Sequence, residues 1–328
     1  MLFHTPVELP TAHATIYPDT PLLLIGSCFS DEIGGLLAMN KLNVLANPFG
    51  VLFNPLSIFD IVEKAILQQN IDNQLFVNRK ELWLHFGLHS DFSELDKDVL
   101  AQKIQTQLAQ VHHFLTQKQP TIYLFITFGT AWVYRHQATG QFVANCHKMP
   151  AQAFTKELLS VATIVENYLK LAEILPENVK TVLTVSPVRH TKDTLPLNSV
   201  SKAVLRLACH EIVEKCPNVL YFPAYEIVTD ELRDYRFYAK DLIHPNEQAI
   251  EYVFKQFEKV FFAPETQQFV TQWGQLRQQL AHQSFHPTTT EHQQFLKNLL
   301  QKLTTLQKEY PYKDFSAEIT RVKNQILF

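Results

Sequence analysis

Four large apolar residues in a row, Leu22 to Ile25, end at Gly26 and lead directly into an amphipathic segment. An uninterrupted apolar run of this kind is typical of a parallel strand that is buried on both faces. The acidic residues Asp31 and Glu32 follow, and acidic side chains are favoured in the first turn of a helix. The stretch therefore predicts a strand, a sharp turn and a helix N-terminus, which is the repeating unit of α/β sheet proteins.

The same pattern recurs along the chain as far as residue 262. Apolar runs predict further strands at 42–46, 122–129, 179–188 and 219–223, and amphipathic segments predict helices near 30–39, 54–67, 94–115, 155–174, 201–215 and 246–262. Strands that alternate with helices form an open sheet with helices on both faces. We therefore expect a three-layer α/β fold with an open, mostly parallel five-stranded sheet.

Two segments interrupt this alternation and a third follows it. Residues 71–93 and 131–150 alternate between apolar and polar side chains around turn residues, which predicts two β-hairpin insertions. Beyond Pro264 the chain is rich in Gln, Leu, Thr and Lys and has no strand pattern. We expect one domain over residues 1–264 and a C-terminal helical extension over 265–328, which packs on that domain or on a second copy of the chain as a homo-oligomer contact.

Composition narrows the classes of partner. The chain is 46% hydrophobic and 19% charged, as in globular proteins with a sizeable core. Its net charge is −3 and no block of Lys and Arg forms a basic stripe, so nucleic acid is not an expected partner. No apolar stretch reaches the roughly 18 residues of a membrane span, and the N-terminus lacks a secretory pattern. We expect a cytoplasmic protein with no membrane partner.

The four cysteines form no CxxC pair and no zinc-binding spacing, so we expect neither a metal nor a cofactor. Cys28 stands apart because it follows Ser27 at the predicted turn after the first strand. Unpaired N–H groups at a helix N-terminus stabilise a thiolate or an oxyanion. The same Gly-Ser pair is also common turn chemistry, so the stretch alone leaves a catalytic and a structural interpretation open.

In an open parallel sheet, ligands bind at the carboxyl ends of the strands. The polar and glycine residues predicted there are Asn47 and Gly50, Gly129 and Thr130, Arg189 and His190, and Asp241 and His244. Acyl transfer requires a nucleophile, an imidazole that takes its proton and a carboxylate that orients the imidazole. Asp241 and His244 are three residues apart in a predicted turn, a spacing that suits the last two roles.

Eight motifs in order resemble the GSCFA-domain family, which is grouped with the SGNH, or GDSL-like, hydrolases. They are GSCFS (26–30), NPFGVLFNP (47–55), FGTAWVY (128–134), NCHK (145–148), SPVRH (186–190), YFPAYEI (221–227), LRDYRFY (232–238) and DLIHP (241–245). The resemblance covers residues 20–262 and implies a flavodoxin-like SGNH fold. It also implies that Asp241 and His244 are catalytic and that the N–H group of Gly50 lines an oxyanion hole.

The resemblance leaves the nucleophile open. An ungapped match of GSCF to GDSF places Cys28 on the nucleophilic serine, with its pKa lowered by the helix N-terminus and His244. A one-residue shift would make Ser27 the nucleophile instead, and a third possibility is a binding module in which neither residue reacts. The family's G-x-N-D block is GTAW here, so that Ala131 replaces the asparagine of the oxyanion hole.

Other polar residues are candidates for binding. Asn145 and His147 could supply the missing oxyanion donor, or could form a capped turn after the hairpin. Arg189 and His190 could hold an anionic or sugar substrate, or Arg189 could form an ion pair with Asp193 or Asp234.

Taken together, the residues and the resemblance imply an SGNH-like hydrolase or acyltransferase. We expect it to act on an ester, such as the O-acetyl or another short acyl group of a carbohydrate. The competing expectation is a carbohydrate- or metabolite-binding protein that keeps the fold without turnover.

Overall fold

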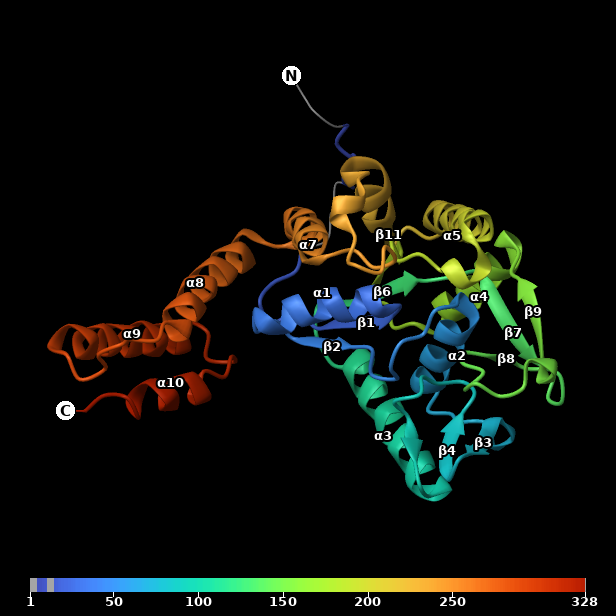
Figure 1. The fold of residues 1–328 in the computed structure, drawn as a ribbon, viewed down its shortest axis with the longest axis horizontal. Coiled ribbons are helices and arrows are strands. Elements are labelled where there is room, and N and C mark those ends of the chain that lie inside the picture. The colour runs from blue at the N-terminus through green and yellow to red at the C-terminus, as the bar shows by residue number, and fades with distance from the viewer. Residues whose placement is uncertain (1–4, 11–14, 328) are drawn as a thin grey trace.

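The computed structural model describes residues 5–10 and 15–327. A central sheet of five strands, all parallel, runs through the middle of the main domain in the order β11-β10-β6-β1-β2 (Figure 1). Its strands are β1 (Leu22–Gly26), β2 (Val44–Ala46), β6 (Ile122–Phe128), β10 (Val179–Val185) and β11 (Val219–Tyr221). The predicted three-layer α/β fold is confirmed.

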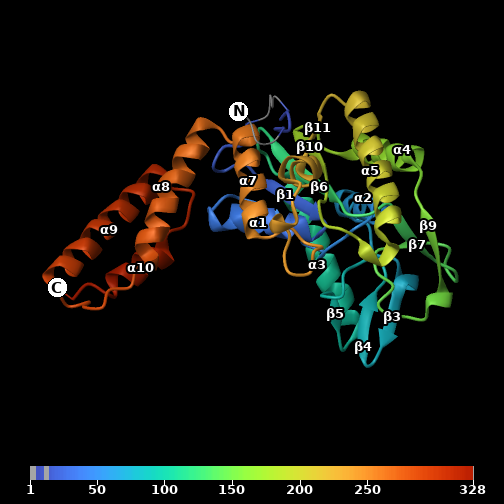
Figure 2. The ribbon, with the colours of Figure 1, turned by 45° about the horizontal axis from the view of Figure 1, so that its top comes forward.

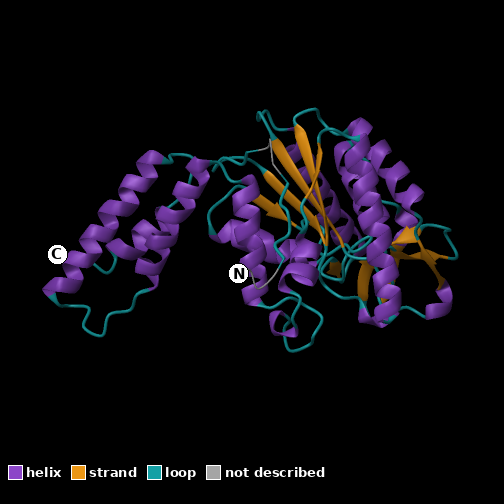
Figure 3. Ribbon diagram, turned by 90° about the horizontal axis from the view of Figure 1, so that it is seen from above, coloured by secondary structure: helices purple, strands orange, loops and turns teal. Residues whose placement is uncertain are grey.

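Helices cover both faces of this sheet (Figure 3). Successive residues of a strand point to opposite faces, so Leu23 and Ile25 pack in one core cluster while Leu22 and Leu24 pack in the other. The first cluster is closed by α2 (Pro55–Ile66), α3 (Lys97–Thr116), α4 (Val161–Ile174) and α5 (Leu195–Lys215). The second is closed by α1 (Cys28–Met39) and α7 (Glu247–Phe261).

Both predicted hairpins are present, and each gains a third strand. The first sheet contains β3 (Phe76–Arg79), β4 (Leu82–His85) and β5 (Ser93–Glu94), and the second contains β7 (Trp132–His136), β8 (Phe142–Val143) and β9 (Phe154–Leu158). Short 3-10 turns, η1 (Asn73–Leu75) and η2 (Ala151–Ala153), precede β3 and β9. Both small sheets lie on the side of the domain away from the C-terminal helices (Figures 1 and 2).

Two predicted helix starts were wrong. The helix expected from 155 begins at Val161, because the preceding residues pair with β7 as strand β9 and Ser160 caps the helix. The helix expected from 201 begins at Leu195, after the 3-10 turn η3 (Thr191–Asp193). Thr194 caps it and a proline lies in its first turn, where a missing N–H costs nothing. Residues 195–200, which we placed before the helix, are therefore helical.

The connection between β11 and α7 is made of short helical turns. They are α6 (Ala224–Glu226), the π-helix η4 (Ile227–Leu232) and the 3-10 turn η5 (Tyr235–Phe237). None of the helices in the described ranges combines the length and hydropathy that a membrane span requires.

The C-terminal extension consists of three helices that project from one end of the domain (Figure 2). They are α8 (Pro264–Ala281), α9 (Thr290–Glu309) and α10 (Ser316–Lys323). They are tied to the C-terminal end of α1: Trp273 Nε1 donates to the carbonyl oxygen of Met39 at 2.9 Å, and Lys313 Nζ donates to that of Lys41 at 2.7 Å. The extension thus packs on its own domain.

Candidate functional site

The sheet order places β2 on one side of β1 and β6 on the other, so the strand order reverses between β1 and β6. Ligands of open α/β sheets bind at the carboxyl ends of the strands at such a reversal. Gly26 ends β1 there with a φ of +144°, and a Cβ on it would lie 2.2 Å from the carbonyl oxygen of Thr127 on β6. Only glycine lets the two strand ends approach so closely, and the turn that follows carries the candidate nucleophiles.

Ser27 and Cys28 differ in their access to solvent. Ser27 is fully buried, and its Oγ accepts the N–H of Phe29 at 3.3 Å, which makes it the N-cap of α1. Cys28 is the first residue of α1 and is half-buried. The geometry therefore favours Cys28 over Ser27 as the residue that a substrate reaches.

The expected lowering of the pKa of Cys28 was wrong. Burial raises that pKa, and the negative charge of Asp31 raises it further, while hydrogen bonds from the N–H groups of Cys28 and Phe29 lower it by less. The helix N-terminus therefore acts in the expected direction but does not dominate. No hydrogen bond within the described ranges joins Ser27 or Cys28 to His244.

Asn47 holds the turn between β1 and α1. Its Oδ1 accepts the N–H of Gly26 at 2.8 Å, and its Nδ2 donates to Asp31 at 2.7 Å. Gly50, at a φ of +70°, donates its N–H to the carbonyl oxygen of Asn47 at 2.8 Å. The N–H that the resemblance assigns to an oxyanion hole is thus engaged in a local turn in this structure.

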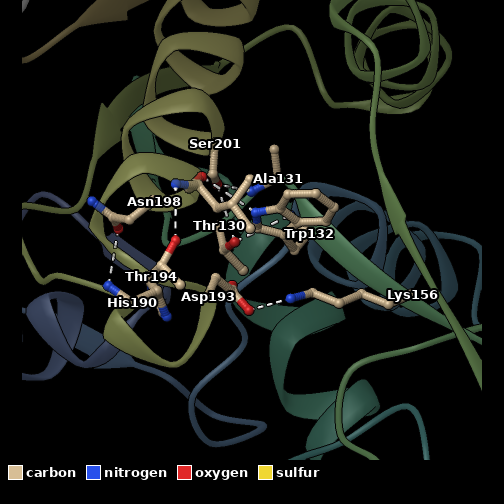
Figure 4. Close-up of polar contacts among 10 residues, drawn as sticks. Thr130, Ala131, Trp132, Lys156, His190, Asp193, Thr194, Asn198 and Ser201 are labelled. Atoms are coloured by element: carbon tan, nitrogen blue, oxygen red, sulfur yellow. Dashed lines mark hydrogen bonds and ion pairs between the residues drawn. The ribbon is translucent and has the colours of Figure 1, made fainter.

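The turn after β6 is held from two sides. The N–H groups of Gly129 and Thr130 both donate to the carbonyl oxygen of Phe53, at 2.8 and 3.0 Å. Ser201 at the first turns of α5 accepts the N–H of Ala131 at 2.7 Å and lies 3.1 Å from Thr130 Oγ1 (Figure 4). These backbone donors are occupied, so this turn does not replace the missing asparagine.

His190 presents an unpaired ring nitrogen. The backbone N–H of His190 donates to Asn198 Oδ1 at 2.9 Å (Figure 4). The imidazole ring stands edge-on to the ring of Phe53, with 5.3 Å between the centroids. Its Nε2 is buried without a hydrogen-bond partner and lies 3.2 Å from the position that a Cβ on Gly129 would take. Burial, and then the charge of Lys202, lowers the pKa of His190 to about 4, so the ring is neutral at pH 7.

Arg189 connects the loop after β10 to the loop that carries the DLIHP motif. The backbone N–H of Arg189 donates to the carbonyl oxygen of Ile243 at 3.2 Å. Its guanidinium lies 4.9 Å from the ring of Tyr235 and 4.2 Å from that of Tyr238. The expected ion pair of Arg189 was wrong. The two acids proposed for it, Asp193 and Asp234, pair with Lys156 and Arg236.

Asp241 and His244 form a hydrogen-bonded pair. His244 Nδ1 lies 2.7 Å from Asp241 Oδ2, and because a carboxylate only accepts, the ring N–H is the donor. Asp241 Oδ1 accepts the N–H groups of Ile243 and His244 at 2.9 and 3.1 Å. The bond from His244 contributes most to lowering the pKa of Asp241 to about 2. Both side chains are about half exposed, and Nε2 of His244 makes no hydrogen bond to the described residues.

Two family models match this chain. The model described as the GSCFA family matches residues 21–257, and the model described as the C-terminal domain of GSCFA domain proteins matches residues 273–327. The chain belongs to the GSCFA family. No curated protein and no solved structure matches it.

In this GSCFA chain Asn145 and His147 form a capped turn. Asn145 Oδ1 accepts the N–H of His147 at 2.8 Å, and His147 Nε2 lies 2.9 Å from the carbonyl oxygen of His85. The ring of His147 stacks on Phe86 in a small apolar cluster between the two small sheets. Both side chains are thus engaged in contacts within the two inserted small sheets.

Lys202 is the site residue that sequence reasoning missed. It is fully buried on α5, and its Nζ donates to the carbonyl oxygens of Gly129 at 2.7 Å and Ser186 at 2.6 Å. Lys202 shares the spacing of Leu205, Cys209 and Ile212, which form the apolar face of the helix. The signal in the sequence that could have identified Lys202 is a charged residue on the apolar face of a predicted helix.

Two grooves of this GSCFA chain lie away from the strand ends. A groove of about 970 Å³ runs between α1, α7 and α8, and a smaller one of about 290 Å³ lies between α8 and α9. Both border the C-terminal helices. The candidate site is therefore defined by its side chains at the strand ends.

Proposed function

We propose that this chain is an ester hydrolase or acyltransferase of the SGNH type, in which Cys28 is the nucleophile, His244 the general base and Asp241 the carboxylate that orients it. The observation that carries the proposal is the 2.7 Å bond between His244 and Asp241. It occurs in a loop that Arg189 ties to the end of β10, and strand ends are where α/β enzymes place their sites. Because Nδ1 is bonded to Asp241, Nε2 of His244 is the ring nitrogen that can accept a proton.

The proposed reaction has two steps. Cys28 Sγ attacks the ester carbonyl carbon while its proton passes to His244 Nε2, and that proton then leaves with the alcohol as the C–O bond breaks. Water, or an acceptor alcohol in a transferase, gives a proton to His244 and attacks the thioester. The C–S bond then breaks, the acyl group leaves as the free acid or the new ester, and the proton passes from His244 to Cys28 Sγ. Asp241 is ionised at neutral pH and stabilises the imidazolium that forms in each step.

Two features support a carbohydrate ester with a short acyl group. Phe53 and His190 close tightly over Gly129, which leaves little depth beside the strand ends. Tyr235 is 58% exposed next to Arg189, and an exposed aromatic face beside a polar group suits a sugar ring.

The second candidate is a carbohydrate- or metabolite-binding protein without turnover. The raised pKa of Cys28 favours it, because a protonated thiol is a weak nucleophile. So does the lack of a hydrogen bond from Cys28 to His244, although catalytic hydrogen bonds are often loose without substrate.

Acetate release distinguishes the two candidates. We expect the purified protein to hydrolyse p-nitrophenyl acetate and a peracetylated sugar, and Cys28→Ala to lose this activity. Cys146→Ala is the matched control, because Cys146 is also a half-buried free thiol, but lies between the small sheets. A folded wild-type protein that releases no acetate above the buffer rate and is labelled by neither iodoacetamide nor a fluorophosphonate would leave only the binding function.

A further inference from the structure

The larger of the two grooves, about 970 Å³ in volume, lies between α1, α7 and α8, at the end of α1 opposite to Cys28. Its lining includes an apolar wall, formed by Met39 on α1, Phe254 on α7 and Val270 on α8. Met39 is 47% exposed, so apolar surface is open to solvent in the groove. The volume is in the range of sites that hold small molecules, roughly 300–1,000 Å³.

Arg277 on α8 also lines this groove, and its charge has no anionic partner. Its Nη2 donates to Asn40 Oδ1 at 3.4 Å, which is its only hydrogen bond to the described residues, and its Nε is buried without an acceptor. Burial lowers the pKa of Arg277 and no carboxylate raises it, but a guanidinium stays charged at neutral pH. Most of its five N–H donors are therefore unused, and burial of a charge that nothing compensates is unfavourable.

Gly274 leaves free space beside Arg277. It lies three residues earlier on the same face of α8 and lines the same groove. A Cβ on Gly274 would meet no atom within 4 Å, so packing does not require glycine at this position. Glycine within a helix is less favourable than any residue with a side chain except proline. The missing side chain therefore keeps open a space that a ligand of the guanidinium can occupy.

The charges of the groove favour a ligand with a single negative charge. The basic side chains of the lining exceed the acidic ones by one: they are Lys255, Lys259 and Arg277 against Glu251 and Glu258. Lys255 and Glu258 pair with each other at 2.7 Å, and the charge of Glu251 opposes a second negative charge on a ligand. A carboxylate carries one charge and fits the fork of a guanidinium, whereas a phosphate group carries up to two.

We propose that this groove binds a small amphiphilic monocarboxylate, whose carboxylate pairs with the guanidinium of Arg277 and whose apolar body lies along the apolar wall beside Gly274. The ligand compensates the charge of Arg277 and covers apolar surface that is exposed without it. The site does not depend on the proposed function, because none of its residues belongs to the strand ends.

Calorimetric titration with octanoate, which has one carboxylate on an apolar chain, tests the proposal. We expect saturable binding of one octanoate per chain. Arg277→Met should weaken it at least tenfold, because the charge-assisted hydrogen bonds to the carboxylate are lost. Gly274→Leu should weaken it by a similar factor, because its side chain occupies the space of the ligand. Leucine favours a helix over glycine, so this variant should fold.

The chain offers a matched control for each variant. Gly35→Leu on α1 replaces another helical glycine with open space around it, but one outside the groove. Arg321→Met on α10 removes an exposed arginine. Both should bind octanoate as the wild type does. Octanol, which has the same chain without the charge, should bind at least tenfold more weakly, and inorganic phosphate should not displace octanoate.

A folded wild-type protein that shows no saturable octanoate binding would overturn the proposal. Equal affinities in the wild type, Arg277→Met and Gly274→Leu would also overturn it, because octanoate would then bind elsewhere. If Arg277→Met does not fold, Gly274→Leu decides alone. Octanol binding as tight as that of octanoate would reject the role of the charge, and displacement by phosphate would reject the carboxylate. The titration contains no ester, so its result is independent of acetate release.

Discussion

Two buried lysines, Lys202 at the strand ends and Lys313 at the junction with the C-terminal helices, are bound in the same way but in different surroundings. Each Nζ donates to two backbone carbonyl groups from segments far apart in the sequence. Lys313 lies over the rings of Phe269 and Tyr312, and the charge of Asp19 favours its protonated form. Lys202 forms no ion pair with any described residue, and the ring of Tyr225 lies 6.0 Å from its Nζ.

The difference shows what a buried cation does in each region. Burial lowers the pKa of Lys313 to about 8 and that of Lys202 to about 7. At the junction the charge of Asp19 favours the ammonium form of Lys313 and that of Lys41 opposes it, and the two hydrogen bonds of Nζ hold the elements together. At the strand ends no carboxylate among the described residues pairs with the amine, and with a pKa of about 7 it is partly neutral at neutral pH.

The largest expected effect is the loss of ester hydrolysis in His244→Ala without a change in stability. Because His244 is half exposed, His244→Ala should leave thermal unfolding unchanged, and it should reduce ester hydrolysis by about 10²- to 10⁴-fold, the usual contribution of a general base. The measurement is kcat with p-nitrophenyl acetate beside a melting curve, with His286→Ala, an exposed histidine outside the site, as control. Full activity in His244→Ala would reject its role as base.

A change in pH should act on the strand ends through His190. Its pKa falls from the usual 6.5 to about 4 on folding, so the unfolded chain binds a proton at a higher pH than the folded one. Its contribution to stability is therefore complete above pH 6.5 and is lost as the pH falls toward 4, by roughly 3 kcal/mol at most.

His190→Phe should therefore flatten the fall of the unfolding free energy between pH 6.5 and 4, measured with urea at several pH values. His85, buried with a pKa also lowered to about 4, maintains part of the slope. His210→Gln, an exposed position on α5, is the control. An unaltered slope in His190→Phe would show that folding does not lower the pKa of His190.

At the junction with the C-terminal helices, replacement of Lys313 should change the stability of the protein but not its activity. Lys313→Met leaves the carbonyl groups of Pro18 and Lys41 without their donor, which should lower the unfolding free energy by about 2 kcal/mol. Activity per folded molecule should not change. Lys297→Met, at an exposed position on α9, is the control in the same urea titration. A loss of activity in folded Lys313→Met would show that the two regions are coupled.

The smallest expected effect distinguishes Ser27 from Cys28. Ser27→Ala removes the cap of α1 and should cost about 1 kcal/mol, as Ser160→Ala should at the cap of α4. Because we assign the nucleophile to Cys28, hydrolysis by folded Ser27→Ala should persist. Its disappearance would assign the reaction to the hydroxyl group.

Local sequence patterns were sufficient for most elements of the fold. The five strands were predicted because each is a short run of mostly apolar residues, and α2 because Asn54 and a proline mark its start. The start of α4 was missed, since β9 is a strand only through its pairing with β7. Pairing between distant segments leaves no periodic signal in one of them alone.

The sequence by itself determined the succession of strands and helices along the chain, the turn that carries Ser27 and Cys28, and the pair Asp241 and His244, because these depend on neighbours within a few residues. Tertiary structure alone decided which residue solvent reaches, the raised pKa of Cys28, the aromatic partners of Arg189 and the burial of Lys202. The reason is that burial and charge interactions are set by segments up to about two hundred residues apart, and these quantities control reactivity.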